Sequence, residues 1–102
     1  MKFTEIKMKP EITKALQEMK LEEAFPIQTS TIPPIMEGKD VIGKAESGSG
    51  KTLVFAIPII EKITEHKNIQ ALILAPTREL AEQVCTEIQR VGKYTKARAL
   101  AV

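Results

Sequence analysis

The stretch Ala45-Glu46-Ser47-Gly48-Ser49-Gly50-Lys51-Thr52 decides the fold class of this chain. Its last three residues complete the phosphate-loop pattern G-x-x-x-x-G-K-[ST], with Ala45 in the place of the first glycine. We expect the backbone N–H groups of residues 48–51 to point at phosphate oxygens, at the positive end of the following helix. The Lys51 ammonium would reach the β- and γ-phosphates, and the Thr52 hydroxyl would bind Mg²⁺. The alternative is a chance Gly/Ser turn before a helix.

The hydrophobic pattern on either side of this loop predicts helices that alternate with short strands. Apolar runs predict strands at residues 40–45, 71–75 and 98–102, the second of them buried on both faces of a parallel sheet. A helix is expected from residue 51 to 57, kinked or restarted by Pro58 and continuing to 63, and another from Thr77, its N-cap, to Gly92. This order indicates an α/β domain with a parallel sheet.

The segment before the loop has helical periodicity instead. Apolar residues predict an amphipathic helix at residues 10–19, with Pro10 in its first turn. A second helix is expected at residues 26–36 and should be disturbed by Pro33-Pro34, and a turn should follow at residues 37–40.

Length and composition allow one small domain. The chain has 102 residues, 43% of them hydrophobic, and a formal net charge of +2 that permits nucleic-acid binding without arguing for it. Cys85 is the single cysteine and is expected to be structural, and His66 has no metal-binding companions. No apolar run reaches the ~20 residues of a membrane helix, and the first residues do not form a secretory signal. We therefore expect a cytoplasmic protein without a membrane partner.

Four features in order resemble one family. VIGKAESGSGKTLVFAIPII resembles motif I of the DEAD-box ATP-dependent RNA helicases, A-x-T-G-x-G-K-T, and Pro76-Thr77-Arg78-Glu79-Leu80 matches their motif Ia. Pro26-Ile27-Gln28 is similar to the end of their Q motif, and Phe3, 25 residues before Gln28, stands where the family has an isolated aromatic. The resemblance implies a three-layer, RecA-like P-loop NTPase with an incomplete parallel sheet. It divides the chain into a helical Q-motif region, 1–38, and a partial ATP-binding domain, 39–102.

The resemblance also implies roles for individual residues. Lys51 and Thr52 would be catalytic, Thr52 would bind the metal, and Gln28 would read the adenine edge. RNA would contact Pro76, Thr77 and Arg78. The residues implied to bind ATP are Phe3, Gln28, Ala45, Ser47, Gly48, Ser49, Gly50, Lys51 and Thr52.

The chain departs from the family pattern before Gln28. Lys20-Leu21 stands where a glycine and an aromatic are usual, and Ala24-Phe25 stands where Pro-Thr is usual. Leu21 or Phe25 could therefore supply the apolar face for adenine.

The family's acidic Asp-Glu-Ala-Asp segment and its Ser-Ala-Thr motif do not occur in the sequence. Phosphoryl transfer needs several such parts, so we expect nucleotide binding without hydrolysis or RNA unwinding. The strand-end terminus suggests an N-terminal piece of a longer helicase. Two alternatives are a stand-alone P-loop binding module and a fragment that forms homo-oligomers through open sheet edges.

Overall fold

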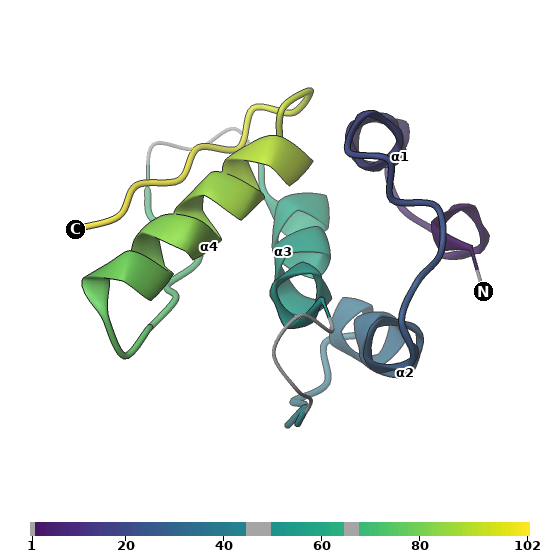
Figure 1. Ribbon diagram of the computed structural model, residues 1–102, viewed down its shortest axis with the longest axis horizontal. Coiled ribbons are helices and arrows are strands. Elements are labelled where there is room, and N and C mark those ends of the chain that lie inside the picture. The colour runs from purple at the N-terminus through teal and green to yellow at the C-terminus, as the bar shows by residue number, and fades with distance from the viewer. Residues whose placement is uncertain (1, 45–49, 65–67) are drawn as a thin grey trace.

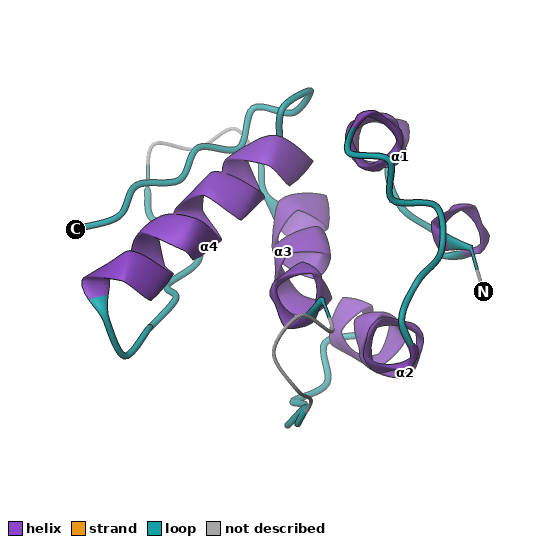
Figure 2. Ribbon diagram, in the orientation of Figure 1, coloured by secondary structure: helices purple, strands orange, loops and turns teal. Residues whose placement is uncertain are grey.

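The computed structural model describes residues 2–44, 50–64 and 68–102, and within them the regular structure is helical. Figure 1 shows α3 lying between α2 and α4, with α1 to one side. Figure 2 shows loops and extended segments joining the helices. The elements in order are a 3-10 helix η1 (Phe3–Glu5), α1 (Pro10–Glu18), α2 (Pro26–Met36), α3 (Lys51–Lys62) and α4 (Arg78–Val91).

The helix boundaries follow the local sequence signals. Pro10 is the first residue of α1, where its missing N–H costs no hydrogen bond. The Thr77 hydroxyl accepts a 3.2 Å hydrogen bond from the Leu80 N–H and caps α4, which ends at Gly92. α3 begins at Lys51 and runs through the buried Pro58 without a break. The predictions of these helices, of the Thr77 cap and of the Gly92 end are confirmed. The restart that was predicted as one alternative at Pro58 is wrong, because α3 is a single helix from Lys51 to Lys62.

The expected disturbance at Pro33-Pro34 is wrong, because α2 continues to Met36. Pro33 is exposed, so carbonyl groups that lose a helical donor near it can bond to water instead. The helix ends where the Gly38 N–H donates to the Ile35 carbonyl, with Gly38 at a φ of +88°. This left-handed glycine closes the predicted turn.

The three predicted strands are not present among the described residues, and the single bridge there pairs Lys2 with Glu23. Residues 72–75 and 98–102 nevertheless keep the alternation of exposed and half-buried side chains that is typical of strands. Leu72 and Leu74 are 81% and 87% exposed, whereas Ile73 between them packs against the core. A strand requires a hydrogen-bonded ladder with a neighbour at about 4.8 Å, and no ladder is formed by these segments among the described residues. The sheet part of the fold prediction, including 40–44, is therefore corrected.

The core brings the beginning and the end of the chain together around α3. Its buried members are Phe3, Ile6, Ile12, Leu16, Ile32, Leu53, Ala56, Ile57, Ile60, Ile88 and Val91. They come from both of the regions expected at 1–38 and 39–102. The radius of gyration is 12.9 Å, close to the ~13 Å of a folded domain of about 100 residues.

A polar contact joins α1 to the segment that follows α4. The Tyr94 hydroxyl donates to the Glu18 carboxylate, and the Lys93 ammonium lies 3.5 Å from the same carboxylate. The Lys14 ammonium lies 4.3 Å from the centroid of the Tyr94 ring. The hydrogen bond from Tyr94 lowers the pKa of Glu18 and raises that of Tyr94 itself. This contact is exposed to solvent and links α1 to the segment after α4.

Replacing Lys20 by glycine should stabilise the protein. Lys20 follows α1 with a φ of +60°, a left-handed conformation that costs a residue with a Cβ about 1 kcal/mol. Glycine removes that strain but gains entropy in the unfolded chain, so we expect a net gain of about 0.5 kcal/mol. Urea denaturation of Lys20→Gly measures it. Gln17→Gly, on the exposed side of α1, should instead lose about 1 kcal/mol. Equal losses for both variants would contradict the strain at Lys20.

Candidate nucleotide site

The described part of the phosphate loop is its end, at the start of α3. Gly50 is the N-cap of α3 with a φ of +79°, the left-handed region that favours glycine. Lys51 and Thr52 form the first turn, Lys51 exposed and Thr52 half-buried. Their N–H groups lie at the positive end of the helix dipole. The predicted contacts of Ala45, Ser47, Gly48 and Ser49 fall outside the described residues.

Gln28 joins the start of α2 to the start of α3. Its Oε1 accepts a 2.7 Å hydrogen bond from the Phe25 N–H, and its Nε2 donates a 3.1 Å bond to the Gly50 carbonyl. The side chain is 1% exposed. Among the described residues, these two bonds leave one N–H and one oxygen lone pair on the amide, which is the combination that an adenine edge needs. Because the group is buried, adenine could reach it only after a neighbour moves, and adenine reading stays a prediction.

The candidate apolar groups for the base differ in exposure. Phe3 lies in the core at 3% exposure, and its N–H donates to the Glu22 carbonyl. Leu21 is half-buried against the same core. Phe25 is 50% exposed, and a Cβ placed on Gly50 would lie 3.1 Å from its ring atom Cδ2. The structure therefore places Phe25 beside the loop end, and the predicted contact of Phe3 with ATP stays a prediction.

Two contacts at the C-terminal end of α3 were not predicted from the sequence. The Lys9 N–H donates to Glu61 Oε2 at 2.9 Å, and the Lys62 ammonium donates to the Ile35 carbonyl at 3.1 Å. With the Gln28–Gly50 bond, these contacts attach both ends of α3 to the N-terminal helices. The partners lie 52 and 27 residues apart in sequence, so no local pattern could have indicated them.

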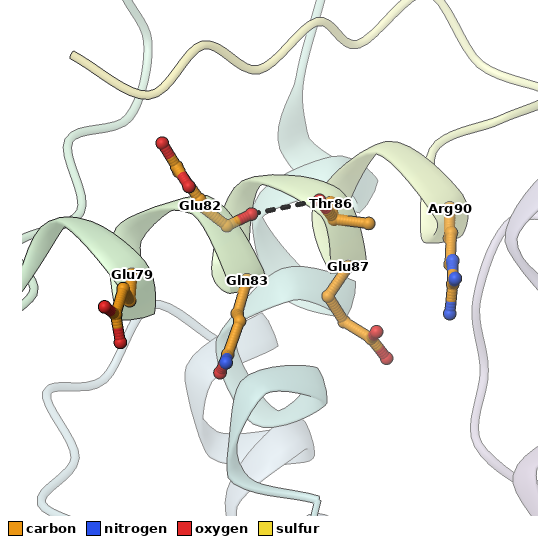
Figure 3. A pocket seen from close by; sticks show the side chains of 6 residues that line it. All are labelled: Glu79, Glu82, Gln83, Thr86, Glu87 and Arg90. Carbon is orange, nitrogen blue, oxygen red and sulfur yellow. Dashed lines mark hydrogen bonds between the residues drawn. The ribbon is translucent and has the colours of Figure 1, made fainter.

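The predicted RNA contacts Pro76, Thr77 and Arg78 are exposed at the start of α4. The outer face of this helix is less suited to phosphate. An open hollow of about 500 Å³ lies on it, and Figure 3 shows the side chains that line it: Glu79, Glu82, Gln83, Thr86, Glu87 and Arg90. Three carboxylates against one guanidinium repel phosphate. A backbone contact with RNA would therefore be confined to the N-terminal end of α4.

A magnesium ion brought by a nucleotide is compatible with the residues at the start of α3. Mg²⁺ keeps several waters and substrate phosphates and is usually held by one or two carboxylates besides, so the Thr52 hydroxyl would supply one of its protein ligands. Within residues 2–44, 50–64 and 68–102, no three His, Cys, Asp or Glu side chains gather into a metal site of their own. Among the same described residues, no helix is both long enough and apolar enough to cross a membrane.

Comparisons with known proteins agree with the motifs. A family model described as DEAD/DEAH box helicase matches residues 25–102. The chain is 50% identical over 103 residues to the ATP-dependent RNA helicase CshA of Limosilactobacillus reuteri, covering 100% of this chain and 21% of that protein. It is 46% identical to the DEAD-box ATP-dependent RNA helicase CshA of Geobacillus kaustophilus, covering 98% and 22%. This chain therefore spans about one fifth of the length of these relatives.

Solved structures give the same result. A DEAD box protein from the hyperthermophile Methanococcus jannaschii is 40% identical with a TM-score of 0.84, covering 89% of this chain and 25% of that one. The S. cerevisiae protein Dbp5, bound to RNA and ADP BeF3, is 34% identical with a TM-score of 0.89, covering 93% and 25%. The neighbours have the fold that the motifs indicated, although the sheet itself does not form among the described residues. By its sequence and its fold, this chain belongs to the DEAD/DEAH box helicase family.

Proposed function

We propose that this chain binds ATP with Mg²⁺ through residues 45–52 and forms the ATP-binding part of an ATP-dependent RNA helicase. The observation that carries the proposal is the start of α3, where a left-handed Gly50 precedes Lys51 and Thr52. A glycine in this conformation lets the backbone approach a ligand closely, and the helix start supplies N–H donors and positive potential. The RNA part of the proposal rests on family membership and on the matched segment Pro76-Thr77-Arg78.

Each residue has a distinct task in this proposal. Lys51 would neutralise charge on the β- and γ-phosphates, and the Thr52 hydroxyl would bind the Mg²⁺ that accompanies them. Bound Mg²⁺ supplies charge neutralisation between the phosphates. Thr77 and Arg78 would grip the RNA backbone without reading bases, which makes that contact salt-dependent. A cytoplasmic location belongs to the same proposal.

Binding without turnover is expected from this chain. Positioning of the attacking water and neutralisation of the transition state need acidic and arginine groups that a binding loop does not contain. The sequence has no Asp-Glu-Ala-Asp segment. The rate of phosphate release from ATP should therefore be the same with the protein as in buffer alone.

Calorimetric titration with MgATP tests the binding proposal. Lys51→Ala should weaken ATP binding at least tenfold, because a hydrogen bond to a charged group contributes about 1.5–3 kcal/mol. Lys7→Ala, which removes the same charge from an exposed N-terminal residue, should bind as the unchanged protein does. Equal affinities for the Lys51 and Lys7 variants would exclude the phosphate loop as the binding site.

Self-association is a second candidate property, and one observation favours it. Leu72, Leu74 and Leu100 are all more than 80% exposed on extended segments without a ladder. Unpaired segments of this kind invite pairing with another copy of the chain. The titrations are therefore run at two protein concentrations, because an affinity that changes with concentration would reveal coupling to oligomer formation.

A further inference from the structure

Phe25 is the exposed aromatic residue at the candidate nucleotide site. It is the N-cap of α2, and its N–H is fixed by the 2.7 Å bond to Gln28 Oε1. Its ring lies against the backbone of Gly50, one residue before Lys51. The side chain is nevertheless 50% exposed. A half-exposed ring therefore lies directly beside the start of the helix that would hold the phosphates.

The other aromatic side chains are engaged elsewhere. The chain has three Phe, one Tyr and no Trp, and all four aromatic residues lie in the described ranges. Phe3 is buried, Phe55 packs against the core, and the Tyr94 hydroxyl bonds to Glu18 while Lys14 covers its ring. Phe25 alone among them combines a solvent-facing ring with a position at the loop end.

We propose that the ring of Phe25 is the surface on which the base of the bound nucleotide stacks. The inference rests on the proposed nucleotide binding and adds a residue that the family motif does not supply, since Thr is usual at this place. Stacking on an aromatic ring tolerates any base, because every base has a π-face. Phe25 would thus strengthen binding of all nucleoside triphosphates, whereas the buried Gln28 amide would distinguish adenine from guanine.

Comparing three ligands separates stacking from phosphate binding. MgATP, MgGTP and magnesium tripolyphosphate are titrated into the unchanged chain, Phe25→Ala and Phe25→Trp. Phe25→Ala should weaken ATP and GTP binding about tenfold, as expected for loss of base–aromatic stacking, and leave tripolyphosphate within about twofold. Phe25→Trp should keep the affinity for both nucleotides. Ile69→Ala, which shortens an exposed apolar side chain away from the loop in sequence, is the matched control and should change nothing.

The outcomes distinguish the two proposals. If the unchanged chain binds neither ATP nor tripolyphosphate, the proposed function fails and this inference fails with it. If ATP binds in a Lys51-dependent way but equally well to Phe25→Ala, only the stacking inference is overturned. A parallel loss of tripolyphosphate binding would also overturn it, because Phe25 would then shape the loop rather than touch the base.

Phe25→Leu keeps the apolar bulk without the π-face. It should lose nucleotide affinity even if the alanine variant unfolds, and full affinity in this variant would overturn the inference.

Discussion

Ile57→Ala should destabilise the protein by about 2–5 kcal/mol, the range for deleting a buried aliphatic side chain. Ile57 is 0% exposed and lies in the core cluster on α3, the helix that contacts α1, α2 and α4. The cavity would lie in the core that α3 shares with its neighbouring helices. Each kcal/mol lowers the melting temperature of a domain of this size by about 4–8 °C. Thermal denaturation followed by circular dichroism measures the loss.

The matched control for this variant is Ile69→Ala. Ile69 is 89% exposed, so the same chemical change should alter the free energy of unfolding by less than about 0.5 kcal/mol. Because many domains are stable by only ~5–15 kcal/mol, Ile57→Ala could also unfold at room temperature, which agrees with the prediction. Similar melting temperatures for the two variants would show that α3 is not the centre of the core.

Gly50→Ala should lower both stability and nucleotide affinity. At a φ of +79° alanine is strained by about 1–2 kcal/mol, and its Cβ would lie 2.1 Å from Gln28 Nε2. Such a contact forces the Gln28 amide away and breaks its 3.1 Å bond to the Gly50 carbonyl, worth about 0.5–1.5 kcal/mol. We expect a total loss of about 2–3 kcal/mol in urea denaturation. In parallel titrations, ATP binding should weaken, because the N-cap before Lys51 is displaced.

Gly38→Ala separates the strain of a positive φ from the clash with the Gln28 side chain. Gly38 also has a positive φ, +88°, but nothing lies within 4 Å of a Cβ placed there. This variant should lose only the same conformational cost, about 1–2 kcal/mol, and bind ATP normally. If Gly38→Ala and Gly50→Ala lost equal stability and neither affected ATP, the contact between Gln28 and Gly50 would have no functional weight.

Local sequence determined the helices because their signals lie within a few residues of one another. Pro10 starts α1, the Thr77 hydroxyl caps α4, and Gly50-Lys51-Thr52 places the phosphate loop at the start of α3. The disturbance predicted at Pro33-Pro34 does not occur in α2. The cost of a proline depends on whether the carbonyl that loses its donor faces water. The apolar run at residues 71–75 predicted a strand, but a strand needs a neighbour that no local pattern supplies.

The motifs by themselves determined the family and named Gln28, Lys51 and Thr52 as candidate residues. Only the tertiary structure decided how those residues meet. In the folded chain Phe3 is buried and Phe25 is exposed beside Gly50. Gln28 bonds to the Phe25 N–H and to the Gly50 carbonyl, at the N-caps of α2 and α3. The fold also attaches α3 to Lys9 and Ile35. The physical reason is that exposure and long-range hydrogen bonds depend on packing between segments 20–50 residues apart, whereas capping and backbone conformation depend on neighbours in the chain.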